Sequence, residues 1–85
     1  MTNKLFLTKK VYDAFNETIN NGRDSVLPGD IVQNFREKNE PVGIWLVMRE
    51  LTRLEELDLV RFDQETATWT LGQEKDFFEV IRNLK

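Results

Sequence analysis

The sequence contains no cysteine and no histidine, and Ser25 is its one serine. The absence of cysteine excludes disulfides and thiolate chemistry. The absence of histidine removes the commonest general base and the commonest transition-metal ligand in proteins. A glycine-rich phosphate-binding loop is also missing, and the sequence offers no plausible base to activate Ser25. We therefore expect a protein that is not an enzyme and that uses neither a cofactor nor a metal.

An excess of basic residues and long apolar runs are missing too. Twelve lysines and arginines stand against fifteen acidic residues, for a formal charge of -3. Dedicated nucleic-acid binders usually have the opposite balance, so only a local basic surface would support that function. No apolar run approaches the ~18 residues that a membrane span needs. Residues 1–10 lack the apolar core and cleavage site of a signal peptide. We expect no membrane contact and a cytoplasmic location.

The length and composition predict one small globular domain. The chain has 85 residues, of which 40% are hydrophobic and 32% charged, and a domain of this size has a modest core. Apolar residues at helical spacing predict a first helix that begins after a Thr8 cap and ends at Gly22. Its expected buried face comprises Val11, Ala14, Phe15, Thr18 and Ile19.

Residues 41–62 are the stretch around which the rest of the chain is organised. The periodicity predicts one amphipathic helix over residues 41–57. It stops at Asp58, where a helix end most often has glycine, and leads directly into a strand. The side expected to face the core carries Ile44, Val47, Met48, Leu51 and Leu54. The side expected to face outward carries Val42, Trp45, Arg49, Thr52, Arg53 and Glu56, with Leu46 at its margin.

The flanking segments complete the expected order of elements. Residues 25–27 form a short extended stretch, after which Pro28 begins a second helix. Residues 59–62 and 68–71 predict a β-hairpin, and residues 73–84 predict a last helix. The expected order is helix, short strand, helix, helix, hairpin, helix, which is a mostly helical member of the α+β class.

The stretch Leu-Thr-Arg-Leu-Glu-Glu-Leu-Asp-Leu-Val at residues 51–60 resembles winged-helix transcription regulators of the MarR and PadR type. In that pattern two leucines three apart precede a charged turn, a glycine, and a Leu-Val or Leu-Ile pair that opens the wing. Thr-Trp-Thr-Leu-Gly at residues 68–72 is similar to the way those families enter their final helix. The similarity is specific over residues 51–72 and covers the order of elements over about residues 9–84. It implies a single winged-helix domain over residues 1–85, with a helix-turn-helix at 28–57, a wing at 59–71 and a C-terminal helix at 73–84.

The resemblance implies a small DNA-binding transcription regulator whose third helix enters the major groove of double-stranded DNA. Carried over by position, the base-facing candidates are Trp45, Leu46, Arg49 and Arg53, and the phosphate-facing candidates are Arg36, Lys38 and Arg61. The regulators it resembles form homodimers. The corresponding dimer interface is the apolar stripe of the last helix, Phe77, Phe78, Ile81 and Leu84, unless that stripe covers the first helix of the same chain.

A protein-interaction domain that does not bind nucleic acid is the alternative, because acids surround the proposed DNA-facing residues. The expected wing loop, residues 63–67, carries two acids and no basic residue. The arginines of the central helix stand beside Glu50, Glu55 and Glu56. Arg49 and Arg53 would then belong to a solvated helix face supported by ion pairs along the helix.

The two tryptophans have different expected places. Trp69 shares its strand face with Leu71 and is expected in the core. An outward Trp45 would form an apolar surface that docks a protein partner. The other reading of Trp45 is that it folds back into the small core.

Overall fold

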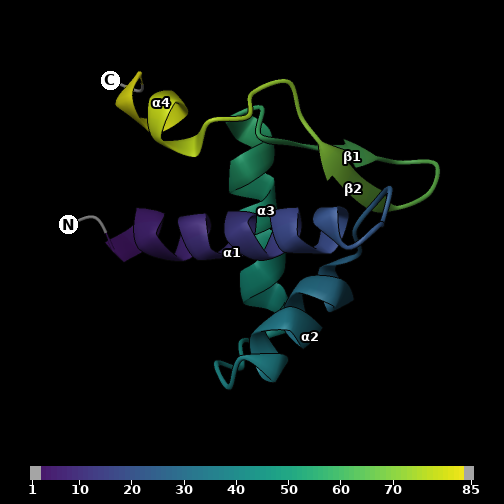
Figure 1. Ribbon diagram of the computed structural model, residues 1–85. Helices are drawn as coiled ribbons and strands as arrows, with labels where there is room; N and C mark the ends of the chain where they lie inside the picture. Colours follow the sequence, from purple (N-terminus) through teal and green to yellow (C-terminus); the bar gives the residue numbers. More distant parts are fainter. Residues whose placement is uncertain (1–2, 84–85) are drawn as a thin grey trace.

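The computed structural model describes the backbone of residues 3–83 and the side chains of residues 5–83. Its elements are α1 (Asn3–Asn20), α2 (Pro28–Glu37), α3 (Ile44–Glu56), β1 (Val60–Asp63), β2 (Thr68–Leu71) and α4 (Phe77–Arg82). This is the expected order in a mostly helical α+β fold. Figure 1 shows α1 crossing α3, with α2 beside one end of α3 and the antiparallel hairpin and α4 toward the other.

The core lies where the three long helices meet, and the hairpin closes it. Its fully or almost fully buried apolar side chains include Val11 and Phe15 of α1, Ile31 and Phe35 of α2, Val47, Leu51 and Leu54 of α3, and Val60 and Trp69 of the hairpin. The face expected for the first helix and the core position of Trp69 are therefore confirmed. The face expected for the central helix is confirmed at Val47, Leu51 and Leu54.

The start of α3 departs from the prediction. The helix begins at Ile44, not at Pro41, because Gly43 is its extended N-cap with φ -81° and ψ 155°. Ile44 therefore has no preceding turn to cover it and is 41% exposed, although it was expected to face the core. Met48, one turn later, is half-buried.

The predicted cap at Thr8 is wrong. α1 begins at Asn3, and Thr8 lies inside the helix with its side chain fully buried. Its hydroxyl donates a hydrogen bond to Glu50 Oε1 on α3 at 2.5 Å. A capping pattern is read from neighbouring residues alone, and it contains no information about a partner on another helix.

The last helix is shorter than expected. It begins at Phe77, after Asp76, whose Oδ1 accepts a hydrogen bond from the backbone N–H of Glu79. The residues before it are held in an irregular connection, because the Glu74 N–H donates to the Asp58 carbonyl at 2.9 Å. Leu84, the last residue of the apolar stripe predicted for this helix, lies outside the described residues.

The hairpin has the expected alternation. Phe62 pairs with Trp69 and Val60 pairs with Leu71 in its register, so all four side chains share one face. Asp63 is the last residue of β1, which leaves residues 64–67 as the loop instead of residues 63–67. Val26, in the expected extended stretch, forms an isolated antiparallel bridge with Trp69, and the two N–H···O bonds are both 2.8 Å long.

Two residues at which the sequence predicted a helix to stop have a left-handed backbone. Gly22 has φ 101°, and Asp58 has φ 65° in the place where glycine is more usual. The turn at Asp58 brings its carbonyl against the chain that leaves β2. A Cβ built on Gly72 would lie 2.3 Å from the Asp58 carbonyl oxygen, so this close approach admits only glycine.

Gly72→Ala is therefore expected to lower the free energy of unfolding by about 1–3 kcal/mol, the scale of an overpacked site. The matched control is Gly29→Ala, because a Cβ at Gly29 in α2 meets nothing within 4 Å. That variant should be neutral or more stable by up to about 1 kcal/mol, since alanine favours a helix. Urea unfolding followed by circular dichroism measures both, and equal stability of the two variants would contradict the close approach.

Candidate interaction surface on the third helix

The outer face of α3 is formed by Trp45, Arg49, Thr52 and Glu56, all of which are exposed. Their spacing places them on one side of a helix, opposite the buried Val47, Leu51 and Leu54. The Trp45 side chain is 84% exposed. The outward orientation expected for the tryptophan is therefore confirmed, and the reading in which it folds back into the core is wrong.

A buried carboxylate lies immediately behind this face. Glu50 is 1% exposed, and its Oε1 accepts the hydrogen bond from Thr8. Its Oε2 accepts hydrogen bonds from Arg49 Nε at 3.3 Å and Nη2 at 3.2 Å. Arg53 Nη1 lies 3.5 Å from Oε1 and also donates to the Thr8 hydroxyl at 3.4 Å. We call these four residues the Glu50 network.

The Glu50 network explains why a charged group can lie in the core. Desolvation disfavours a buried carboxylate unless charges and hydrogen bonds compensate it. Two guanidinium groups and a hydroxyl do so here, and with one carboxylate the network keeps a net charge of +1. The sequence reading placed Glu50 among the surface acids. The signal that could have located it is its spacing, because Glu50 follows Val47 by three residues and precedes Leu54 by four.

The other basic candidates are distributed around α3. Arg36 is exposed in the last turn of α2, and Arg61 is exposed on β1. Lys38 Nζ lies 2.9 Å from Glu17 Oε2 on α1, so this amine points toward α1 and away from the outer face of α3. A hydrogen bond from Asn34 and, next, the Lys38 ammonium lower the pKa of Glu17. Leu46 is half-buried at the edge of α3.

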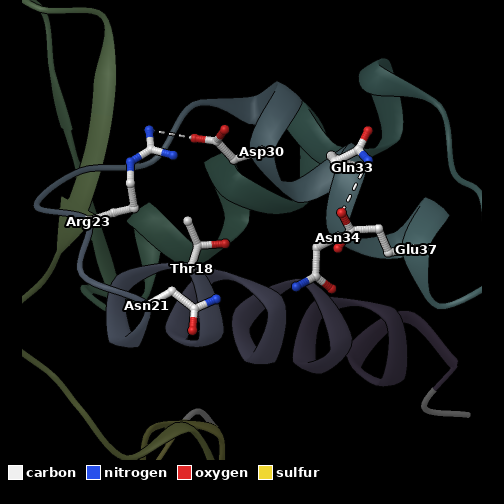
Figure 2. A pocket seen from close by; sticks show the side chains of 7 residues that line it. All are labelled: Thr18, Asn21, Arg23, Asp30, Gln33, Asn34 and Glu37. Atoms are coloured by element: carbon white, nitrogen blue, oxygen red, sulfur yellow. Dashed lines mark hydrogen bonds and ion pairs between the residues drawn. The ribbon is translucent and has the colours of Figure 1, made fainter.

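A polar cleft of about 280 Å³ lies between the end of α1 and α2, away from the outer face of α3. Figure 2 shows its lining side chains, Thr18, Asn21, Arg23, Asp30, Gln33, Asn34 and Glu37. Its polar groups largely satisfy one another, because Arg23 pairs with Asp30 at 3.0 Å and Gln33 donates to Glu37 at 3.3 Å. Within residues 5–83, Asn34 Oδ1 is a buried acceptor with no hydrogen-bond partner.

An apolar groove of about 400 Å³ lies between the start of α1 and α4. Phe77 is buried and stacks on Tyr12 with ring centroids 6.0 Å apart, so one half of the predicted stripe covers α1 of the same chain. Phe78 and Phe6 are 65% and 66% exposed along the groove. Ile81, which also lines the groove, is half-buried.

Comparisons with protein-family models, with curated proteins and with solved structures found no match. Within the described residues, none of the helices has the length and apolar character that a membrane span requires.

Trp45→Ala is expected to change the free energy of unfolding by no more than about 0.5 kcal/mol, because the side chain is exposed. Trp69→Ala should cost about 3–5 kcal/mol, the scale for removing a buried aromatic side chain. Urea unfolding of both variants measures the contrast. A large loss of stability in Trp45→Ala would place that side chain in the core and remove the proposed surface.

Proposed function

We propose that this chain is a winged-helix domain that binds double-stranded DNA with α3 in the major groove and the β1–β2 hairpin as the wing. The observation that carries the proposal is the exposure of Trp45 and Arg49, one turn apart near the start of α3. In helix-turn-helix proteins the N-terminal part of the recognition helix contacts the base edges.

Three features support the winged-helix assignment. The α2–α3 pair has a short break of six residues, from Lys38 to Gly43, between its helices. The Val26–Trp69 bridge ties the segment before α2 to the hairpin as a rudimentary third strand. The left-handed Asp58 turns the chain from α3 directly into the hairpin. The Asp58 turn belongs to the pattern that residues 51–72 resemble, and the other two features agree with the expected order of elements.

The proposed contacts divide between bases and phosphates. Arg49 carries donors that match the O6 and N7 acceptors of guanine, a contact that typically contributes about 1–3 kcal/mol of discrimination. The Trp45 indole offers an apolar contact to a base edge such as the thymine methyl group. Arg36 and Arg61 are the proposed phosphate contacts, since both are exposed and neither has an ion pair of 4.0 Å or less among the described residues. Leu46 and Arg53 are secondary candidates at the margin of α3, whereas Lys38 is paired with Glu17 on α1.

DNA binding is expected to be weak and dependent on salt. Titration of fluorescent random duplex DNA between about 50 and 200 mM salt should give a log–log slope near -0.9 per phosphate contact. Arg36→Ala and Arg61→Ala should each reduce the magnitude of the slope by about 0.9, the value for one phosphate contact. Arg82→Ala removes an exposed charge on α4 that is not among the proposed DNA contacts, and it serves as the control. No binding at the lowest salt would remove DNA from the proposal.

A protein partner is the second candidate, and two observations favour it. The exposed indole of Trp45 lies beside Ile44, which is 41% exposed, and tryptophan is enriched at binding hot spots. The proposed wing loop is flanked by Asp63 and contains Glu65, which repel phosphate. Failure of the DNA titration leaves this candidate, and Trp45→Ala is the variant that should then abolish capture of the partner while the fold is retained.

We also propose that two copies of the chain associate through the apolar groove between α1 and α4. Phe78 is large, apolar and exposed at the edge of the groove that Phe6 also lines. In a twofold arrangement, Phe78 of each copy would enter the groove of the other, so that one patch serves both subunits. Two DNA half-sites would then be read by one dimer.

Sedimentation equilibrium over a wide concentration range tests the dimer. The unmodified chain should be a dimer at high concentration, and Phe78→Ser should shift it toward monomer without loss of the helical signal. Trp45→Ala removes a more exposed aromatic side chain from another surface and should leave association unchanged. An unmodified chain that stays monomeric at every concentration would contradict the proposal.

A further inference from the structure

Arg49 lies on the exposed outer face of α3 and is hydrogen-bonded to the buried carboxylate of Glu50. Its side chain is 62% exposed, whereas Glu50 is 1% exposed. Nε and Nη2 both donate to Glu50 Oε2, at 3.3 and 3.2 Å. One edge of the planar guanidinium is thus turned toward the core. Of its five N–H donors, two are used on Glu50, which leaves three on Nη1 and Nη2 for other acceptors.

The carboxylate that holds Arg49 is itself held from the first helix. Thr8 donates to Glu50 Oε1 at 2.5 Å, and Arg53 approaches the same oxygen at 3.5 Å. Thr8 is fully buried inside α1, so the acceptor for Arg49 is anchored across the α1–α3 contact. A surface arginine normally samples many rotamers and loses that freedom on binding. Anchoring the guanidinium before binding reduces the entropic cost.

We propose that Glu50 is a positioning residue that presents Arg49 for bidentate recognition of one guanine. The inference rests on the proposed DNA binding and names the base pair feature that α3 reads. Two outward donors in a fixed plane match the O6 and N7 acceptors of guanine. An unanchored Arg49 can instead swing to a phosphate, which carries no sequence information. Glu50 therefore acts on sequence discrimination more than on overall affinity.

The first test selects bound duplexes from a library with a randomised central segment. The affinity of selected and unselected duplexes is then measured by titration. The variants are Arg49→Ala, Glu50→Gln and, as the matched control, Glu55→Gln. Glu55 carries the same charge on the same helix, is not part of its outer face, is exposed and has no ion pair of 4.0 Å or less among the described residues. Thr8→Val replaces Glu50→Gln if that variant does not fold, because it loosens the same carboxylate from α1.

The unmodified chain should enrich guanine at one position, and Arg49→Ala should lose that preference. Glu50→Gln should lower the preference at the same position by about tenfold, the scale of one bidentate contact. Its affinity for unselected duplex should stay within about threefold of the unmodified chain or increase, because the substitution removes a negative charge. Glu55→Gln should retain the preference. Full retention by Glu50→Gln would overturn the positioning role while leaving DNA binding intact.

A second measurement needs no DNA. In the unmodified chain the Arg49 Nε–H should give a slowly exchanging, displaced resonance in nitrogen–proton NMR spectra, because the hydrogen bond to Glu50 immobilises it. Glu50→Gln should return that resonance to the position of a solvated arginine, and Glu55→Gln should not. An Arg49 resonance typical of free solvent in the unmodified chain would overturn the inference. A library that shows no binding at all would overturn the proposed function itself, so the two failures are distinguished.

Discussion

The burial of one carboxylate at the contact between α1 and α3 is the constraint on which the candidate interaction surface depends. Glu50 lies among the apolar side chains of the core, yet it keeps its partners because Thr8 approaches from α1 and two arginines approach along α3. Removing one partner of such a group leaves an uncompensated buried charge, which is costly. The rotation of α3 about its axis is therefore determined by both apolar packing and polar pairing. That rotation turns Trp45 outward.

Four ion pairs lie on the rest of the surface that the structure describes. Ion pairs join Lys9 to Asp13, Lys10 to Glu40, Arg23 to Asp30 and Lys38 to Glu17. Exposed pairs of this kind contribute only about 0–1 kcal/mol each, so a phosphate or a partner's carboxylate can replace one member at small cost. The formal charge of -3 thus describes the whole chain but not every face of it. For a ligand, the charges near α3 matter most. The Glu50 network there has a net charge of +1, whereas the loop at residues 64–67 contains Glu65 and no basic residue.

The hairpin is attached to the helical core at two points that do not depend on helix packing. Val26 pairs with Trp69 through two backbone hydrogen bonds, and the chain beyond β2 returns to the Asp58 turn, where the Gly72 N–H donates to the Leu59 carbonyl at 3.0 Å. These contacts fix the position of β1 and β2 beside the end of α3 (Figure 1). A ligand that touches both α3 and the hairpin would meet two elements already held in one geometry, so little ordering would be needed on binding.

The sequence by itself determined the order of the elements, most of the apolar side of the first and central helices and the alternation of the hairpin, because hydrophobic periodicity reports which side of an element avoids water. It also located the stops near Gly22 and Asp58, which depend on local backbone chemistry. Only the tertiary structure decided that Thr8 is no cap, that α4 is short and that Glu50 is buried. Each of these depends on a contact between residues far apart in the chain, such as the 42-residue separation of Thr8 and Glu50. A local sequence pattern cannot predict that the hydroxyl of Thr8 on one helix will contact the carboxylate of Glu50 on another. This contact holds the carboxylate to which Arg49 is hydrogen-bonded.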